Sequence, residues 1–345
     1  MITKIGITYN LKSDFSEKEA VSSEHCEEFD NENTINAICE VFNRNGYQAV
    51  KLGFDLEMIK KIKNEKVDFV FNIAEGCRGR NREAHIPCLL EMLDVPYSGS
   101  DPLTLGLTLD KTMTKKIALQ AKIPTPRYTI ITSTKEIWKI DKKLNYPLII
   151  KPAWEGSSKG IYNSSRVYSE PELKKNLTCL LESYSQQPIL IEEYIEGREI
   201  TAGVIGNNPA QLLGIMEITH KNSYDDDFFY SLETKRDWKN LVNYVSPPDI
   251  EQSLAEHIRQ YALLAFKEFG CRDIARIDFK ISNDNKIFLL ELNPLPGLSP
   301  EYADLVIMAK KNGIEYEKLI LSILNCGLER YSTLNKEIRF DLRIH

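Results

Sequence analysis

Strand-like and helix-like segments alternate over the first part of this chain, and this alternation is the strongest constraint on its fold. The segments "KIGITYN" and "VDFVFNI" are short and rich in β-branched or aromatic residues. Between them lie two helical patterns, and a third, "EAHIPCLLEMLDV", follows and is stopped by Pro96. Alternating strands and helices favour a parallel sheet. We therefore predict an N-terminal α/β domain over residues 1–97.

The first of these helical patterns has clear boundary signals. Its apolar face recurs at helical spacing, with Ile35, Ile38 and Val41 on one side. Asn33 or Thr34 could cap its start, and Asn45-Gly46 is a typical end.

Two further units follow in the pattern. The segment "DPLTLGLTLDKTMTKKIALQAKIPTP" is helical, and "RYTIIT" and "YPLIIKPA" are strands on either side of a helix near 134–144. A helix near 170–184 and the strand "PILIEEYI" complete a smaller α+β unit, which we place at 98–190. The remainder, 191–345, contains a long helix and the strands "IARIDFKIS" and "KIFLLELN" joined by a turn at Asn283-Asp284-Asn285. This third unit has antiparallel character.

Composition and charge exclude several classes of protein. The 345 residues are 42% hydrophobic and 27% charged, with a formal charge of −6 from intermixed lysine and glutamate. These values are typical of a soluble protein and argue against a nucleic-acid or anionic-membrane surface. The start of the chain does not resemble a signal peptide, so we expect a cytoplasmic location. Seven cysteines without a CxxC pair and five scattered histidines argue against a zinc site.

An acidic group lies on the late hairpin. Asp278 is on one strand, and Glu291 and Asn293 are two residues apart on the next, so these two face the same way. Oxygen ligands without histidine or cysteine suit Mg²⁺, which usually takes one or two carboxylates plus substrate phosphates. A solvated hairpin face is the alternative, although both carboxylates lie inside apolar strands, where an unpaired charge is costly.

Two lysines and a loop of small residues form a basic group. Lys111 begins a helical segment, Lys151 ends an apolar strand, and "EGSSKG" at 155–160 follows. Glycine lets backbone N–H groups approach a ligand closely and serine adds hydroxyl donors, so such loops can hold phosphates. The alternatives are surface lysines with extended stems and an ordinary turn.

Two more segments could contact a nucleotide or a reacting group. "ILIEEYIEGRE" runs from an apolar strand into Glu192, Glu193, Ile195 and Glu199, which offer an apolar wall and carboxylates for a purine and a ribose. A strand followed by a charged turn is the alternative. In "ELNPLPGLSPEY", Gly297 and Ser299 follow the predicted metal ligands and could present N–H donors to an oxyanion, or simply begin a helix.

Six motifs in order resemble the ATP-grasp ligases, and most of all the D-alanine–D-alanine ligase branch. They are "YSGS…LDK", "IIKPAWEGSSKG", "LIEEYIEGRE", "ARIDF" and "LLELNPLPGLSP", which together span about residues 67–325. The resemblance implies a three-subdomain ATP-grasp fold of α/β and α+β units. The first of the three units would be an N-terminal parallel-sheet domain, and the nucleotide would bind between the central and C-terminal units. A homodimer is consistent with this family.

The resemblance also implies a reaction and its nucleotide site. The γ-phosphate of ATP would phosphorylate a carboxylate, and an amine would attack the acyl phosphate to give an amide and phosphate. Mg²⁺, two ions in this family with Mn²⁺ as a possible substitute, would be held by the hairpin group. The ATP-binding residues implied are Lys111, Lys151, Glu155, Gly156, Ser157, Ser158, Glu192, Glu193, Ile195, Glu199 and Lys235. Among them, Glu192 and Ile195 would face adenine and Glu199 the ribose.

Catalytic roles are implied for four residues. Arg276 lies two residues before Asp278 on the same strand face and, with the Gly297 N–H, would stabilise the acyl phosphate and the tetrahedral oxyanion. Ser157 lies in the loop over the phosphates. The segment "FFYSLETKRDW" resembles the mobile lid of this branch and places Lys235 at a phosphate-contacting position.

The departures from the family concern the substrates. The glycine-rich start is absent, and either Glu17 or Glu19 could be the glutamate that holds the first amino group. Glu75 stands where the family has histidine, Arg80 near its acid, and Arg236 where it has tyrosine; we include Ser299 as a substrate candidate. Structural ion pairs explain these residues equally well. We therefore predict a carboxylate–amine ligase that makes a dipeptide or small amide, with D-alanine not carried over as its substrate.

Two other functions remain open from the sequence. An ATP-grasp kinase would phosphorylate a hydroxyl and would not need the Gly297 turn. A non-catalytic nucleotide-binding module would not need the complete set of metal ligands and lysines.

Overall fold

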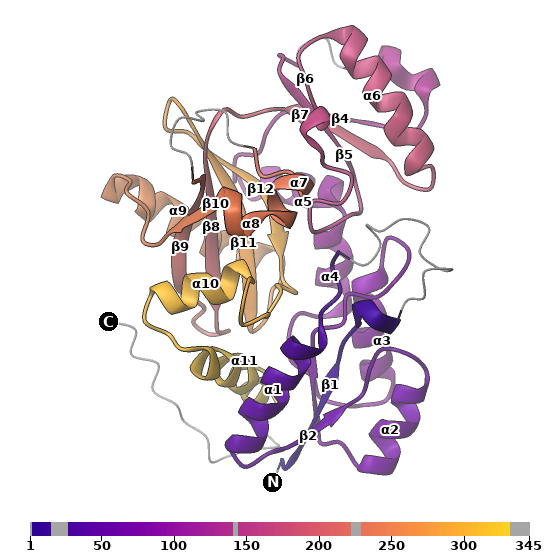
Figure 1. Cartoon of the computed structure of the whole chain (residues 1–345), viewed down its shortest axis with the longest axis vertical. Helices are drawn as coiled ribbons and strands as arrows, with labels where there is room; N and C mark the ends of the chain where they lie inside the picture. Colours follow the sequence, from indigo (N-terminus) through magenta and orange to yellow (C-terminus); the bar gives the residue numbers. More distant parts are fainter. Residues whose placement is uncertain (1, 15–26, 141–143, 222–228, 332–345) are drawn as a thin grey trace.

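The computed structural model describes residues 2–14, 27–140, 144–221 and 229–331, which form three sheets with flanking helices (Figure 1). Residues 1–97 carry the first sheet, in the order β2-β1-β3 with all strands parallel, as predicted. Its elements are β1 (Lys4–Thr8), η1 (Lys12–Asp14), α1 (Glu32–Arg44), β2 (Gln48–Lys51), α2 (Glu57–Glu65), β3 (Phe69–Asn72), η3 (Arg82–Ala84) and α3 (His85–Met92).

Helix α1 begins two residues earlier than the predicted caps allow. The N-cap is Asn31, whose side chain accepts a hydrogen bond of 2.9 Å from the Thr34 N–H. Asn33 and Thr34 therefore lie inside the helix, and the prediction that one of them caps it is wrong. The predicted end is confirmed, because Asn45 is the C-cap and Gly46 adopts a positive φ of 85°.

The helical segment after residue 101 is two helices, α4 (Pro102–Leu109) and α5 (Lys111–Gln120), with a break at Asp110. Asp110 is extended, with ψ of 98°, and its carboxylate accepts hydrogen bonds from the N–H groups of Thr112 (2.9 Å) and Met113 (3.2 Å). This cap makes Lys111 the first residue of α5. The break therefore directs that lysine out of the helix junction.

The second sheet is antiparallel and has the order β4-β7-β5-β6. Its elements are β4 (Tyr128–Ile131), η4 (Thr134–Lys139), β5 (Leu148–Pro152), η5 (Asn163–Ser165), β6 (Arg166–Val167), α6 (Glu170–Ser183) and β7 (Ile189–Glu193). Within the described part of 134–144, the predicted helix is the short 3₁₀ helix η4. Strand β7 runs past residue 190, so this sheet extends beyond the predicted boundary; the three-unit division itself stays a prediction.

The third sheet has the order β10-β9-β8-β11-β12 and is antiparallel, as predicted for the C-terminal unit. Its elements are β8 (Gly197–Ile205), β9 (Gln211–His220), α7 (Leu232–Arg236), α8 (Trp238–Leu241), β10 (Val242–Val245), α9 (Gln252–Glu268), β11 (Ile274–Ser282), β12 (Ile287–Asn293), α10 (Asp304–Lys311) and α11 (Tyr316–Arg330).

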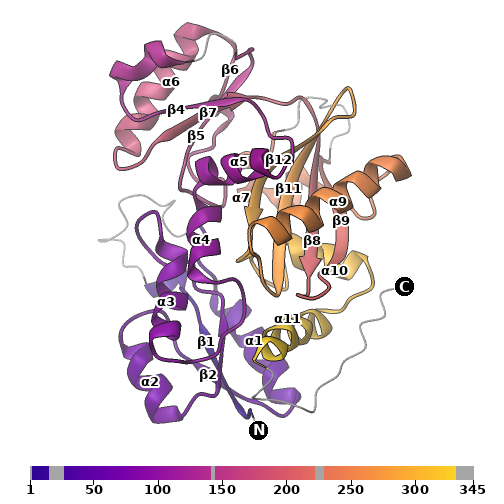
Figure 2. The same cartoon turned by 180° about the vertical axis from the view of Figure 1, so that it is seen from behind.

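The last two helices connect the third sheet with the first. Side chains of α10 and α11 share one apolar core with α1, β1 and β3, and both views show α11 beside α1 (Figures 1 and 2). Arg330 reinforces this junction, because its guanidinium contacts the buried Asp273 at 2.8 Å and the Tyr97 carbonyl at 2.8 Å. Among the helices in the described ranges, none is both long and apolar enough to span a bilayer.

Candidate active site

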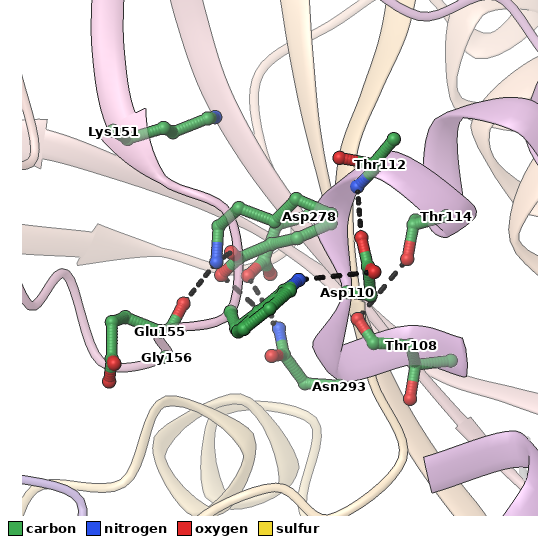
Figure 3. A network of polar contacts seen from close by, with 12 residues as sticks. Thr108, Asp110, Thr112, Thr114, Lys151, Glu155, Gly156, Asp278 and Asn293 are labelled. Atoms are coloured by element: carbon green, nitrogen blue, oxygen red, sulfur yellow. Dashed lines mark hydrogen bonds and ion pairs between the residues drawn. The ribbon is translucent and has the colours of Figure 1, made fainter. Parts of the chain in front are cut away.

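The late hairpin brings the predicted metal ligands together. In the pairing of β11 with β12, Asp278 lies opposite Glu291 and Arg276 opposite Asn293. The Asn293 amide donates to Asp278 Oδ2 at 3.0 Å and to Glu291 Oε1 at 3.4 Å. Figure 3 shows the Asn293 amide turned toward the carboxylate of Asp278. The three oxygen-bearing side chains therefore converge, as the alternation of strand residues predicted.

Arg276 holds this group from one side. Its guanidinium lies 2.8 Å from Asp278, 3.8 Å from Glu291 and 3.5 Å from Asp304. Burial alone would raise the pKa of Glu291, but Lys111, Arg276 and Lys151 outweigh it and lower that pKa to about 2. Burial raises the pKa of Asp278, and the charge of Glu291 adds to this against the opposing Arg276. One hairpin carboxylate is thus firmly ionised and the other would gain from an additional cation.

The donor set fits a magnesium ion that shares its coordination with phosphate oxygens. Two carboxylates and one amide oxygen are hard ligands, and Mg²⁺ is usually bound by one or two carboxylates together with substrate phosphates. Within the described residues, no group of three or more histidine, cysteine, aspartate or glutamate side chains could hold a metal on its own. The protein ligands are therefore too few for a closed structural site, which fits an ion that arrives with a nucleotide.

Lys111 faces these acids across one pocket. Its ammonium lies 3.5 Å from Glu291 Oε2 and donates to the Glu155 carbonyl. The pocket is lined from all parts of the chain, by Glu28, Glu75, Glu83, Thr108, Leu109, Lys111, Glu155, Gly156, Ser157, Lys235, Arg276, Glu291, Leu292, Asn293, Pro294, Leu295, Pro296 and Gly297. Lys111, the 155–157 loop and Lys235 thus share one cavity with Glu291 and Asn293 of the hairpin, whereas Asp278 is not among the residues that line it.

Lys151 belongs to a buried ion triad that the sequence did not reveal. It pairs with Glu192 Oε1, and Lys115 lies 2.5 Å from Glu192 Oε2. The Lys115 side chain is fully buried and also donates to Thr125 Oγ1 at 2.8 Å. Burial lowers the pKa of Lys115 to about 8, with Lys151 adding to this effect and Glu192 opposing it. Glu192, predicted to face adenine, is thus already neutralised by two lysines.

Replacement of Lys115 by methionine tests this triad. Glu192 would keep Lys151, so we expect a loss of about 2 kcal/mol in the free energy of unfolding, below the ~3–5 kcal/mol typical when a buried charge loses its partner outright. Urea unfolding would measure it. Lys116→Met is the matched control, because Lys116 is the exposed neighbour in α5 and should change stability by less than about 0.5 kcal/mol. Equal effects of the two variants would refute the buried triad as a stabilising element.

The 155–160 loop is held by Glu28, a residue that we did not predict. The Gly156 N–H donates to Glu28 Oε1 at 2.8 Å, and Lys159 lies 2.9 Å from Glu28 Oε2. A side chain at position 156 would strike this carboxylate, since an added Cβ would lie 2.5 Å from Glu28 Oε1. Ser157 and Ser158 both take left-handed conformations, with φ of 50° and 58°. The absence of a side chain at Gly156 and the left-handed backbone of the two serines thus let the loop pack closely against the Glu28 carboxylate.

Arg82 completes the contact between the N-terminal unit and this loop. Its guanidinium lies 2.8 Å from Glu28 Oε1 and donates to the Trp154 carbonyl at 2.7 Å. Burial would raise the pKa of Glu28, but Arg82 and Lys159 outweigh it and lower that pKa to about 2. Nothing in the local sequence marks Glu28, because both of its cationic partners lie more than fifty residues away.

This lowered pKa predicts a specific acid sensitivity. The folded pKa of Glu28 lies below its ordinary value of 4.5, so its contribution is complete above pH 4.5 and is lost as the pH falls toward about 2. The full contribution is roughly 3 kcal/mol, of which roughly 2 kcal/mol should be gone at pH 3. Urea unfolding at pH 5 and at pH 3 measures how much free energy of unfolding is lost between the two. This loss should be smaller for Glu28→Gln than for the native chain. The same loss in both would contradict the assignment.

Helix α7 lies over the pocket in the segment predicted to be a lid. Lys235 lines the pocket, and within the described residues its ammonium has no ion pair. Burial lowers the pKa of Lys235, while Asp304 opposes this shift. Arg236 points elsewhere and donates to Glu27 at 2.8 Å. The lid also joins the loop region, because the Leu232 N–H donates to the Ile161 carbonyl at 2.9 Å. The adjacent residues Glu27 and Glu28 thus contact the segment predicted to be a lid and the 155–160 loop.

The other predicted nucleotide residues lie along β7 and β8. Glu199 pairs with Lys280 at 3.1 Å. Glu193 points away from Glu192, and its carboxylate accepts from the Asn145 N–H at 2.8 Å and lies 3.6 Å from Arg127. Ile195 is half-buried in the connection between the strands. Their contacts with adenine and ribose stay predictions.

The predicted substrate residues divide into two groups. Glu75 lines the pocket, and so does the catalytic candidate Gly297. Arg80 is not among the lining residues; it lies 2.7 Å from Asp110 and over the Trp154 ring, and Arg236 pairs with Glu27. Ser299 is buried beside the pocket and its hydroxyl accepts from the Glu301 N–H at 3.4 Å. Glu17 and Glu19 lie outside the described residues.

Comparison with known proteins gives consistent matches. The family described as "D-ala D-ala ligase C-terminus" matches residues 117–325. The D-alanine–D-alanine ligase of Carboxydothermus hydrogenoformans is 36% identical over 305 residues, which cover 86% of this chain and 93% of that protein. That of Pelotomaculum thermopropionicum is 31% identical with the same coverage. A crystal structure of the Bacillus anthracis D-alanine–D-alanine ligase complexed with ATP has a TM-score of 0.73 and 25% identity, covering 97% of this chain and all of that one.

Proposed function

Because this chain belongs to the D-alanine–D-alanine ligase family and is an ATP-dependent ligase that forms C–N bonds, we propose that it joins two small amino acids through an acyl phosphate in the pocket between the hairpin and Lys111. The observation that carries the proposal is the meeting of Lys111 with Glu291 at 3.5 Å, beside Arg276, in one cavity. Anion-binding cations and metal-binding acids share that cavity.

The side chains suggest how the work is divided. Lys111, Lys235 and the 155–158 loop would hold the phosphates, and Mg²⁺ held by Asp278, Glu291 and Asn293 would offset the charge that develops on them. Arg276 and the Gly297 N–H would bind the oxyanion; within the described residues, that N–H has no hydrogen-bond acceptor. Glu75 would bind a substrate ammonium.

Glu28 positions rather than reacts in this scheme. Its carboxylate is saturated by Arg82, Lys159 and the Gly156 N–H, so it sets the place of the loop over the phosphates. A Mg²⁺ requirement and a homodimer remain further proposals, which metal titration and light scattering would test.

The two alternative functions are not favoured. The curated relatives are ligases, and the lysines and metal ligands that a non-catalytic module would not need are present and converge. A kinase would leave the phosphate on its product. The discriminating assay supplies amino acids in pairs and follows ADP, phosphate and product mass. Amine-dependent release of both ADP and phosphate with a dehydrated product supports the ligase, whereas a product heavier by one phosphoryl group would overturn it.

The lid contact gives a smaller prediction. Arg236 and Glu27 are partly exposed, so their pair is worth at most about 1 kcal/mol, and Arg236→Ala should open the lid by no more than about fivefold. Closure excludes water from the acyl phosphate. We therefore expect more phosphate released per amide formed, measured by parallel phosphate and product assays. Lys239→Ala, an exposed change in the next helix, is the control, and an unchanged ratio in Arg236→Ala would count against the lid.

A further inference from the structure

Two carboxylates that line the pocket make no ion pair within the part of the chain that the structure describes. Glu75 and Glu83 both line the cavity that contains Lys111 and Arg276. Within the described ranges, neither carboxylate makes a hydrogen bond or an ion pair. Glu83 is only 8% exposed, and its carboxylate oxygens keep some accessible surface. An unpaired charge at such a position is costly, which makes these two carboxylates an unusual feature of the pocket lining.

The neighbouring acids Glu28 and Glu155 have cationic partners, so the unpaired negative charge in this part of the pocket belongs to Glu75 and Glu83. Glu28 has Arg82, Lys159 and the Gly156 N–H, and Glu155 lies 2.6 Å from Lys159. Arg82 and Lys159, the cations nearest to this part of the pocket, are therefore already paired with Glu28 and Glu155. Burial and the charge of Glu28 raise the pKa of Glu83 to about 7, although Arg82 opposes this shift. Burial and the charges of Glu83 and Glu28 raise the pKa of Glu75 well above its ordinary value.

The arrangement does not suit a second metal ion. Within the described residues, these acids do not form a cluster that could hold a metal. Two carboxylates that line one cavity can each pair with a cationic group, so they suit an organic cation that carries two such groups on one carbon chain.

The position of Glu75 and Glu83 also indicates which of the two substrates they face, the acid or the attacking amine. Lys111, at the proposed phosphate end, and Glu83 line the same cavity. The carboxylate that becomes phosphorylated must lie at that end. The molecule that lies between Glu83 and the phosphates is therefore the acid substrate rather than the attacking amine.

We propose that the acid substrate is a basic amino acid, whose α-ammonium and second cationic group are bound by Glu75 and Glu83. This inference rests on the proposed ligase function and names its substrate class. A neutral amino acid would satisfy one carboxylate and leave the other buried without a partner. A substrate with two cationic groups satisfies both, while its carboxylate meets Arg276 and Lys111.

The test compares isosteric pairs that differ only in charge. Ornithine is matched with norleucine, and arginine with citrulline, each as D- and L-enantiomer, with a mixture of glycine and both alanines as amine. We expect kcat/KM for phosphate release to favour the basic member by about tenfold or more, the effect of ~1.4 kcal/mol. Tandem mass spectrometry should place the basic residue at the amino-terminal position of the product, since its carboxyl group enters the amide.

Two variants and a calorimetric binding experiment show whether a failed test counts against the basic-substrate inference or against the ligase proposal. Glu83→Gln should reduce the basic-to-neutral ratio toward one, while Glu57→Gln on the exposed face of α2 should keep it. Calorimetry with ADP and Mg²⁺ should show tighter binding of ornithine than of norleucine, with proton release at pH 7 that Glu83→Gln removes. Amide formation with equal or reversed preference overturns the inference alone. Absence of any amine-dependent turnover overturns the ligase proposal, and calorimetry then still decides whether the basic member is preferred.

Discussion

Replacement of Glu291 by alanine should nearly abolish turnover, with a fall in kcat of at least about 10³-fold, the scale on which charge stabilisation acts in phosphoryl transfer. Glu291 is the hairpin carboxylate with the lowered pKa, and it lies between Lys111 and Arg276. Without it, the proposed metal would keep one carboxylate and one amide. The measurement is steady-state ADP release with saturating amino acids and Mg²⁺.

The fold should survive this change, which keeps the prediction specific. Lys111 would retain the Glu155 carbonyl, and Arg276 would retain Asp278 and Asp304. Thermal unfolding of Glu291→Ala should therefore remain cooperative. Glu301→Ala, an exposed change just beyond the pocket, should keep kcat within about twofold. A kcat for Glu291→Ala within tenfold of the native value would remove the metal assignment.

Replacement of Arg276 by lysine should lower kcat by about 10²–10³-fold, which corresponds to ~2.7–4 kcal/mol for the loss of one oxyanion donor. Arg276 contacts Asp278 through Nε and Nη2 and Asp304 through Nη1, whereas lysine keeps the charge but has a single nitrogen and cannot reproduce this geometry. Because the lost interaction belongs to the transition state, KM for ATP should change by less than about fivefold.

The matched control is Arg259→Lys, which changes an exposed arginine paired with Glu256 on α9. It should leave both constants unchanged. If Arg276→Lys instead raised KM and kept kcat, Arg276 would bind the ground state, and its role at the oxyanion would be refuted.

Local sequence rules were sufficient to bring the hairpin acids and Lys111 together, but not to find the partner of Lys151. The i, i+2 alternation placed Glu291 with Asn293, and the apolar strand context implied that these acids needed partners. Lys111 and the 155–157 loop reached the same pocket because strand and helix ends mark where side chains leave the core. The family resemblance then assigned roles that spacing alone could not.

Long-range partners explain what the sequence did not reveal. Glu28 acquires its importance from Arg82 and Lys159, and Lys115 from Glu192, and no spacing rule connects such distant residues. Arg80 and Arg236 were assigned to the substrate from their positions in the family resemblance, with structural ion pairs as an equal alternative, and each does pair with a nearby acid, Asp110 or Glu27. A charged side chain follows its closest partner, and that partner is known only once the chain is folded.

The most direct test of the central claim follows an oxygen atom. In the proposed mechanism, the γ-phosphate of ATP is transferred to the substrate carboxylate before the amine attacks. With the acid substrate labelled with ¹⁸O in its carboxyl group, each amide formed should place one ¹⁸O in the released phosphate, detected by mass spectrometry, with ADP as the only nucleotide product. Amide formation with unlabelled phosphate, or with the label in AMP, would contradict it.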